Sequence, residues 1–193
     1  TDGDVLIPHD PLISAAHLEI KRQKSPDGYR WRLRDLGSTN GTFVRLLHFR
    51  VLRNYELILG TTRFRFCIPE TTHTDGSEGR SESSTRGWAA VSRGALAVMA
   101  GPTLIQLDGD DEIASFSLGE SQVIGSTAGN ADLKIDDPLL EPSHARLYRM
   151  PNGKWYIEDQ GSLNGVWIRI ECSHTSRHCE FLLGEQRFVL KVL

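Results

Sequence analysis

Polar side chains suited to binding a ligand gather in two short clusters. The first holds Ser14 and His17, and the second runs from Asp35 to Thr42 with the sequence DLGSTNGT. Hydroxyl groups donate and accept hydrogen bonds, and the amide of Asn40 offers both a donor and an acceptor. A histidine can also act as a general base, but no Ser, Asp or Cys lies at a recognisable triad spacing around His17. The clusters therefore indicate a recognition site rather than a catalytic one.

Other signatures of an enzyme or of a metal protein are weak. The chain has no phosphate-binding P-loop, no nucleophile elbow and no paired catalytic carboxylates in context. Four possible zinc ligands occur close together, and they are Cys172, His174, His178 and Cys179. Their spacing matches no common zinc knuckle, and we expect this segment to be a loop between strands. We therefore predict a protein that is not an enzyme and that carries neither a metal nor a cofactor.

Both clusters occur a second time in the chain. Nine residues of the first copy recur 124 positions later. They are Trp31, Asp35, Gly37, Ser38, Asn40, Gly41, Gly60, Arg63 and Phe64, and their partners are Trp155, Asp159, Gly161, Ser162, Asn164, Gly165, Gly184, Arg187 and Phe188. Asp10-Pro11-Leu12 and His17 recur at an offset of 127, as Asp137-Pro138-Leu139 and His144. The ordered set indicates an internal duplication with a length difference near residues 24–28.

Short strands are expected to position these clusters. Apolar and polar residues alternate over residues 31–36, 62–66 and 154–158, and an alternation of period two marks half-buried strands. No segment shows a sustained helical period with caps. Because short strands recur at close spacing, we predict an all-β fold with two β-sandwiches in tandem.

A polar segment separates the two copies. Residues 71–87 are rich in Ser, Thr, Gly and charge, which predicts a flexible linker, and residues 88–100 are apolar. The predicted domains are therefore 1–70 and 101–193, with a linker over 71–100.

The first copy is shorter than the second. The second has strand-like segments ahead of Asp132, whereas the first begins at the equivalent position. A sandwich without its opening strands would expose apolar faces and unpaired strand edges. We expect upstream residues, residues 88–100 or another chain to cover them.

The composition of the 193 residues narrows the environment and the partners. A net charge of -3 argues against a broad basic surface for nucleic acid. The best apolar stretch, residues 88–100, is too short to span a bilayer, and no signal segment begins at Thr1. The 3 cysteines form no disulfide framework, which suits a reducing compartment. We therefore expect an intracellular protein, in the cytoplasm or nucleus, that binds neither nucleic acid nor a membrane.

The repeated motifs resemble the forkhead-associated (FHA) family. The family pattern is Gly-Arg, then Ser-x-x-His, then Ser-x-Asn-Gly-Thr, then an apolar strand that ends in Leu-Gly. Here the last element is residues 56–60 in the first copy and 180–184 in the second. The resemblance covers nearly all of 1–70 and 101–193. It implies a β-sandwich whose loops at one end bind phosphothreonine in an extended peptide.

In the first copy the resemblance assigns most of a phosphopeptide site. The residues assigned to phosphopeptide binding are Ser14, Ser38, Thr39 and Asn40. A phosphate carries about -1.5 to -2 charges and three strong acceptors, so it needs several donors. By resemblance the serines and the threonine contact the phosphate, the asparagine grips the peptide backbone, and His17 and Gly41 take structural roles. The phosphate-binding arginine of the family would lie before Thr1.

The second copy departs from the family pattern at two positions. Gly125 matches the family glycine, but Ser126 follows it in place of arginine, and Glu141 stands where serine is expected. A carboxylate repels a phosphate, and loss of the arginine removes the main cation. The positions that are kept are Ser162, Asn164 and the structural residues His144 and Gly165. We interpret this copy as a degenerate site, although an alternative alignment uses Ser143 as the phosphate donor.

Two functions remain in competition. The first is phosphothreonine-dependent protein recognition, mainly through the first copy, with a phosphorylated protein as the partner. The alternative is a phosphate-independent scaffold or dimerisation module. In that case another molecule of the same protein, or a domain in cis, pairs with the incomplete first sandwich by strand addition.

Overall fold

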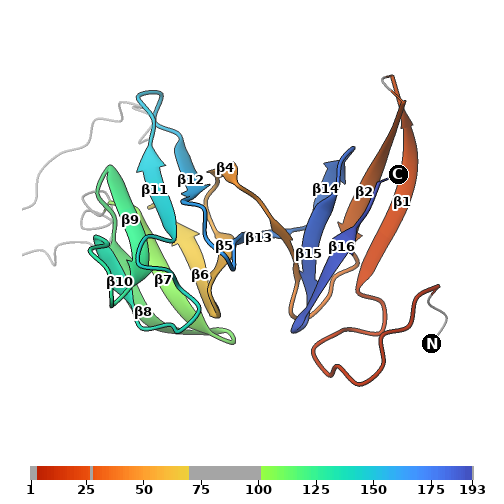
Figure 1. Ribbon diagram of the computed structural model, residues 1–193, viewed down its shortest axis with the longest axis horizontal. Helices are drawn as coiled ribbons and strands as arrows, with labels where there is room; N and C mark the ends of the chain where they lie inside the picture. The colour runs from red at the N-terminus through yellow and green to blue at the C-terminus, as the bar shows by residue number, and fades with distance from the viewer. Residues whose placement is uncertain (1–3, 27, 70–100, 193) are drawn as a thin grey trace, which may run out of the picture.

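A computed structural model describes residues 4–26, 28–69 and 101–192 of the chain (Figure 1). Within these ranges every regular element is a strand, which confirms the predicted all-β fold. The predicted linker, residues 71–100, lies outside the described ranges. The described part of the chain contains no helix that is long and apolar enough to cross a membrane.

Each copy of the repeat contributes its own set of strands. Those of the first copy are β1 (Leu18–Ser25), β2 (Gly28–Asp35), β3 (Thr42–Arg45), β4 (His48–Val51), β5 (Tyr55–Leu59) and β6 (Thr62–Cys67). Those of the second copy are β7 (Thr103–Asp108), β8 (Asp111–Ser117), β9 (Ser121–Ser126), β10 (Leu133–Ile135), β11 (Ala145–Arg149), β12 (Trp155–Asp159), β13 (Val166–Ile170), β14 (Cys172–Thr175), β15 (Cys179–Leu183) and β16 (Gln186–Leu190).

The predicted alternations of apolar and polar residues coincide with strands β2, β6 and β12. In β6, Phe64 and Phe66 are fully buried, whereas Arg63 and Arg65 are partly exposed. Successive side chains of a strand point to opposite faces, so one face of β6 enters a core and the other carries charge.

The strands form three hydrogen-bonded sheets, and each sheet contains strands of both copies. The largest has eight strands in the order β16-β15-β3-β13-β5-β6-β7-β8. A five-stranded sheet has the order β10-β9-β11-β12-β4, and a three-stranded sheet has the order β1-β2-β14.

The last strands of each copy pair with the other copy. From the first copy, β4 pairs with β12, β5 pairs with β13, and β6 pairs with β7. Reciprocally, β14 pairs with β2, and β15 pairs with β3. This is a strand exchange of the kind seen in domain swapping, but within one chain. The sheets therefore cross the boundary between the repeats 1–70 and 101–193.

The exchange produces two sandwiches of unequal size, which stand side by side in Figure 1. In the complete sandwich, the five-stranded sheet packs against β13-β5-β6-β7-β8 around a core that includes Leu57, Phe64 and Ile157. In the open sandwich, β1-β2-β14 packs against β16-β15-β3 around a smaller core that includes Leu33 and Phe181. Because burial of apolar area drives folding, the complete sandwich supplies most of the stability.

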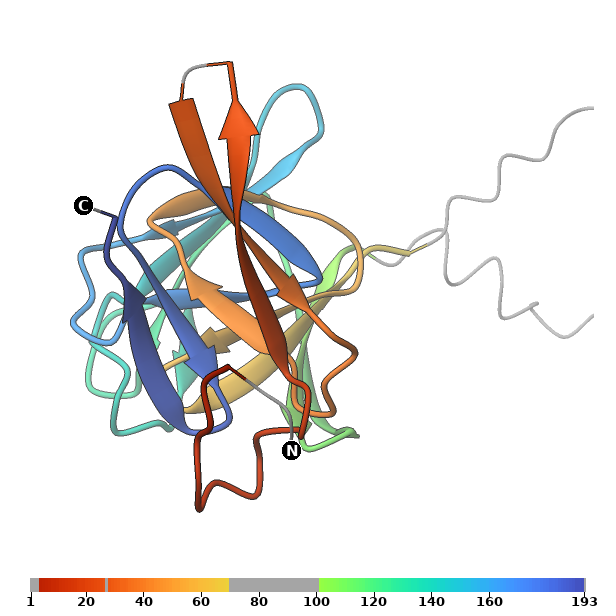
Figure 2. The same ribbon diagram turned by 90° about the vertical axis from the view of Figure 1, so that its right-hand side faces the viewer.

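Within the described ranges, the open sandwich has no counterparts of the opening strands of the complete one. In the complete sandwich, β7 pairs with β6 and β9 pairs with β11. None of the strands in the described ranges pairs with the corresponding outer edges of β16 and β1. The second view, in Figure 2, shows the β1–β2 hairpin extending past the sheets.

The chain crosses between the sandwiches through short, hydrogen-bonded connections. Asp159 donates its backbone N–H to the carbonyl of Leu47, between β3 and β4, at 2.8 Å. Asp35 donates its backbone N–H to the carbonyl of Glu171, between β13 and β14, at 2.9 Å. Each crossing is thus tied to the strand end that leads into one of the two polar loops.

Candidate functional site

The polar clusters predicted from the sequence come together in each copy. In the first copy, residues 10–17 lie beside residues 36–41. We call residues 36–41 loop 1. In the second copy, residues 137–144 lie beside residues 160–165. We call residues 160–165 loop 2. Loop 1 connects β2 to β3, and loop 2 connects β12 to β13, so each loop joins a strand of one sheet to a strand of another.

The carboxylate of Asp35 organises loop 1 from within. Its Oδ1 accepts hydrogen bonds from the backbone N–H groups of Gly37 and Ser38 at 2.9 and 2.8 Å. Its Oδ2 accepts hydrogen bonds from the hydroxyls of Ser38 and Thr42 at 2.6 and 2.7 Å. Burial alone would raise the pKa of Asp35, but the hydrogen bonds from Ser38 and Thr42 outweigh it and hold the pKa below its ordinary value.

The buried imidazole of His17 joins loop 1 to residues 10–17. Its Nδ1 accepts the backbone N–H of Ser14 at 3.0 Å, and its Nε2 lies 3.1 Å from the carbonyl oxygen of Gly41. The ring is therefore a neutral tautomer whose Nε2–H donates to Gly41. With both ring nitrogens occupied, His17 holds the two segments together from inside.

Three of the four predicted phosphopeptide-binding residues line the outer surface of this site. The hydroxyl oxygen of Ser14 accepts the backbone N–H of Thr39 at 3.1 Å, which leaves its hydrogen free to donate to a ligand. Thr39 is exposed. Asn40 donates from Nδ2 to the carbonyl of Leu12 at 2.9 Å, and its Oδ1 is a hydrogen-bond acceptor. The surface therefore offers hydroxyl donors beside an amide acceptor.

The fourth predicted residue, Ser38, lies inside the loop. It is 6% exposed, its hydroxyl donates to Asp35, and its oxygen accepts the backbone N–H of Gly41 at 3.0 Å. Gly41 has a φ of 83°, a conformation that favours glycine. Ser38 thus shapes the turn that presents Thr39 and Asn40.

Loop 2 repeats this framework around a carboxylate. Oε1 of Glu141 accepts the backbone N–H of Leu163 at 2.8 Å, the bond that Ser14 makes in the first copy. The second carboxylate oxygen lies 2.7 Å from Nδ1 of His144. Glu141, rather than the exposed Ser143, is therefore the structural counterpart of Ser14. An ionised carboxylate only accepts hydrogen bonds, so it offers a phosphate no donor.

Among the described residues, the aspartate inside loop 2 accepts fewer hydrogen bonds than Asp35 does in loop 1. Ser162 donates its backbone N–H to Oδ1 of Asp159 at 2.8 Å, and the hydroxyl oxygen of Ser162 accepts the N–H of Gly165 at 3.0 Å. Val166 stands where the first copy has Thr42 and provides no hydroxyl. Oδ2 of Asp159 is buried and has no hydrogen-bond partner in the described part of the chain. A buried acceptor left in this way destabilises the fold.

Gly125 and Ser126 lie where the family pattern has Gly-Arg. A Cβ atom on Gly125 would collide with the backbone carbonyls of Pro142 and Glu141, so this position requires glycine. Ser126 donates its backbone N–H to the carbonyl of Glu141 at 2.9 Å. The backbone of the family motif is therefore kept beside loop 2, but its cation is absent.

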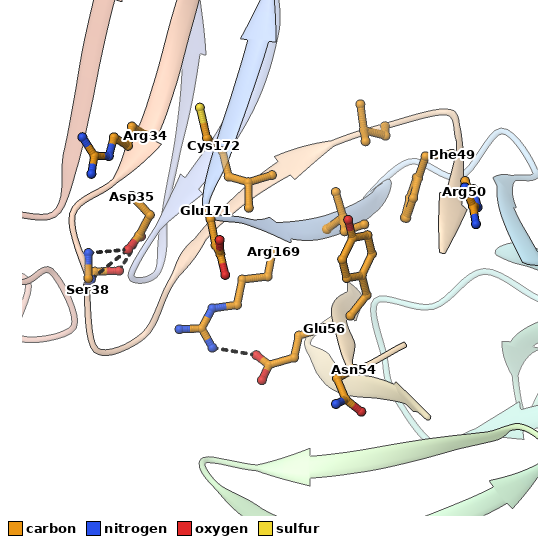
Figure 3. Close-up of a pocket in the computed structure, with 15 residues that line it drawn as sticks. Arg34, Asp35, Ser38, Phe49, Arg50, Asn54, Glu56, Arg169, Glu171 and Cys172 are labelled. Atoms are coloured by element: carbon orange, nitrogen blue, oxygen red, sulfur yellow. Dashed lines mark hydrogen bonds and ion pairs between the residues drawn. The ribbon is translucent and has the colours of Figure 1, made fainter. Parts of the chain in front are cut away.

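A groove of about 1100 Å³ opens beside loop 1, between the two sandwiches (Figure 3). Asp35 and Ser38 form one wall, and Arg50 of β4 lies at the far end. Between them, Arg169 of β13 donates to the carboxylate of Glu56 at 3.0 Å. The groove therefore places a side chain of the second copy next to the loop of the first.

A repeated aspartate, for which the sequence suggested no role, fastens each site to the exchanged strands. Oδ2 of Asp137 accepts the backbone N–H and hydroxyl of Thr61, both at 2.8 Å, and the hydroxyl of Thr62 at 2.7 Å. In the other sandwich, Asp10 accepts the side-chain amide of Gln186 at 3.1 Å. The repetition of Asp-Pro-Leu in the sequence could have pointed to a role for this aspartate. The residues that it binds could not be predicted in this way, because they belong to the opposite copy.

The prediction of a loop around the cysteine–histidine segment was wrong. Cys172 and His174 belong to β14, and Cys179 begins β15. The residues of β14 are mostly polar, so no strand pattern is visible in the sequence there. The strand forms by pairing with β2 of the other copy, which is a result of the exchange. Cys172 and Cys179 are free thiols in different sheets, and no group of three metal-ligating side chains was found in the described ranges.

The sheets and the repeated loops together define a β-sandwich protein. The FHA domain family model matches residues 1–65 and 122–174, more than half of the chain. The chain therefore belongs to the FHA family, whose members are generally phosphopeptide-recognition modules rather than enzymes.

Curated relatives are similar in sequence to one part of this chain. The FHA domain-containing protein FhaB of Mycobacterium tuberculosis, in strains CDC 1551 and H37Rv, is 36% identical over 55 residues. The match covers 28% of this chain and 35% of the relative, so the chain spans about a third of the relative's length. No solved structure matches the chain significantly.

Proposed function

We propose that the chain binds phosphothreonine in a partner protein, and that it does so through the first copy. The observation that carries this proposal is the hydrogen bond from the N–H of Thr39 to the hydroxyl oxygen of Ser14. A hydroxyl that accepts one hydrogen bond keeps its hydrogen for donation, so Ser14 has a donor to offer to a phosphate oxygen.

The charges around loop 1 support the same proposal. The carboxylate of Asp35 accepts four hydrogen bonds from loop 1 and from Thr42, and loop 1 itself has no acidic side chain. Asn40 supplies an amide acceptor for the backbone of a bound peptide. We infer that Ser14, Thr39 and Asn40 contact the ligand, and that Ser38 acts by shaping the turn.

Loop 2 is unsuited to a phosphate in the same position. The carboxylate of Glu141 occupies the place of the Ser14 hydroxyl. Two like unit charges at 4 Å repel by roughly 1 kcal/mol in water and about 4 kcal/mol at an effective dielectric constant of 20. We propose that the second copy serves as a support, and that its Ser126, Ser162 and Asn164 do not hold a phosphate.

Fluorescence anisotropy on the whole chain tests the proposal. A degenerate phosphothreonine peptide library is compared with its unphosphorylated form, and Ser14→Ala and Asn40→Ala are run beside the matched control Asn164→Ala. A hydrogen bond to a charged group contributes about 1.5–3 kcal/mol, so we expect Ser14→Ala to weaken binding by roughly one to two orders of magnitude. The Asn164→Ala variant should bind as the unmodified chain does. Binding that ignores the phosphate, or that is lost only in the control, rejects the proposal.

A phosphate-independent scaffold or dimerisation function is the second candidate. The outer edges of β1 and β16 pair with no other strand of the described residues, which favours it, because a free strand edge can accept a strand from another chain. Analytical ultracentrifugation of the chain without peptide separates the two candidates. A concentration-dependent dimer together with no phosphate-dependent binding would support the scaffold.

A further inference from the structure

An arginine from the opposite copy lies against each recognition loop. Arg169 of β13 covers Gly41 so closely that a Cβ atom on this glycine would lie 2.5 Å from the arginine Nε. Arg45 of β3 covers Gly165 of loop 2 in the same way. The two arginines and the two glycines are each 124 positions apart, so the arrangement is duplicated along with the sequence.

The contact is a direct result of the strand exchange. β3 and β13 are antiparallel neighbours, with Trp167 opposite Arg45 and Ile170 opposite Thr42. Loop 1 leads directly into β3, and loop 2 leads directly into β13. The far end of each strand therefore reaches the loop at the start of the other strand.

Each arginine is also fixed by an acidic residue of an exchanged strand. Arg169 donates to Glu56 of β5 at 3.0 Å, and Glu56 is also paired with Arg63. Burial opposes ionisation of Glu56, but the two arginines hold its pKa below the ordinary value. Arg45 pairs with Glu180 of β15 at 3.3 Å.

The two contacts differ in strength. Arg45 donates to the backbone carbonyls of Ser162 and Leu163 at 3.0 and 3.4 Å, so it is hydrogen-bonded to loop 2. Arg169 packs on Gly41, whose carbonyl oxygen is held from within by His17 at 3.1 Å. Loop 1 is thus clamped between a histidine of its own copy and an arginine of the other.

We infer that Arg169 and Arg45 are positioning residues, each of which holds the loop of the opposite copy in its observed conformation, so that phosphopeptide affinity of the first copy depends on the second copy. This inference rests on the proposed function of loop 1. It gives the degenerate copy a role, because β13 carries the residue that fixes the functional loop.

Phosphopeptide binding by Arg169→Ala in the whole chain tests the inference. The matched control is Arg63→Ala, which also removes a partner of Glu56 but does not cover Gly41. With the phosphothreonine peptide library as the probe, Arg169→Ala should weaken binding about tenfold, within the range of ordinary coupling between sites. Arg63→Ala should weaken it less than about twofold, and Arg169→Lys, which keeps the charge, should recover part of the affinity. Equal losses in Arg169→Ala and Arg63→Ala would overturn the inference.

Backbone amide signals in the free protein provide a readout that does not need a ligand. In NMR spectra, Arg169→Ala should shift the amides of Thr39 and Gly41, and Arg45→Ala should shift the amide of Gly165. Unchanged loop amides in both variants would overturn the inference even if peptide binding is strong. If the unmodified chain ignores phosphothreonine, the proposed function fails, and the amide shifts still decide whether the arginines position the loops. The spectrum of Arg169→Lys serves the same purpose if Arg169→Ala does not fold.

Discussion

Loop 1 and loop 2 have matching backbone frameworks. His17 and His144 each lie within hydrogen-bond distance of a glycine carbonyl of their loop, at 3.1 and 3.0 Å. Asn40 and Asn164 each donate to a leucine carbonyl, at 2.9 and 2.8 Å. These residues hold the loop whether or not it faces a ligand, so their presence in a sequence indicates the architecture and not the activity.

The two loops differ in the groups around that framework. Ser14 of the first copy corresponds to Glu141 of the second, which replaces a hydroxyl donor by a carboxylate. Thr42 corresponds to Val166, which has no hydroxyl to donate, and one carboxylate oxygen of Asp159 is without a partner in the described part of the chain. The two loops therefore share one framework and differ in two of the side chains around it, one at the outer surface and one inside the loop.

The largest expected effect comes from making loop 1 resemble loop 2. Ser14→Glu should weaken phosphothreonine-peptide binding by about a hundredfold or more, because it replaces a donor by a like charge. Anisotropy with the phosphopeptide library measures the loss, and Ser14→Gln is the neutral control of similar size. Retained binding in Ser14→Glu would mean that Ser14 does not face the phosphate.

The reverse change should produce a smaller gain. The double variant Glu141→Ser with Ser126→Arg restores the family residues at both altered positions, and we expect affinity for phosphothreonine peptides at loop 2 to rise about tenfold. The measurement is made in a chain that also carries Asn40→Ala, so that loop 1 does not contribute. Glu141→Ser alone should gain less, because the cation is still missing. No gain in the double variant would show that loop 2 is altered beyond these two side chains.

Thr42 and Val166 occupy the same inner position of the two loops, and exchanging their residue types should stabilise one variant and destabilise the other. Val166→Thr offers a hydroxyl to the unpaired oxygen of Asp159 and should stabilise the fold by about 1 kcal/mol. Thr42→Val removes a donor from Asp35 and should destabilise it by about 1 kcal/mol. Denaturant unfolding of the two variants beside the unmodified chain measures both changes. The same sign for both would contradict the comparison of the loops.

The smallest expected effect is on the pH dependence of stability. The pKa of Asp35 in the folded protein lies below its ordinary value of 3.8, so the unfolded chain binds more protons in the acid range. The contribution of Asp35 is therefore fully present above the ordinary pKa and is lost as pH falls through the folded pKa. Asp35→Asn should flatten the fall in the free energy of unfolding below about pH 4, whereas the exposed control Asp111→Asn should not.

The repeat, the all-β class and the residues of the loops were predictable because they depend on local pattern. Alternating residues predicted β6, and the Ser-x-Asn-Gly signature located both loops. The inward orientation of Ser38 was not predictable, since it depends on Asp35 and Gly41 meeting in three dimensions.

The strand exchange could not be predicted from the sequence either. Because the copies are similar, β4 has a suitable partner in either β2 or β12, and local pattern does not choose between them. In the structure β4 pairs with β12 and β14 pairs with β2. The polar strand β14 and the contact between Arg169 and Gly41 both follow from that choice.

An NMR titration of the isotope-labelled whole chain with a phosphothreonine peptide tests the central claim most directly. The account predicts that the amides of Ser14, Thr39 and Asn40 shift with the phosphorylated peptide and not with its unphosphorylated form, while the amides of Leu163 and Asn164 stay in place. Shifts confined to loop 2, or the same shifts with both peptides, would contradict recognition of phosphothreonine by the first copy.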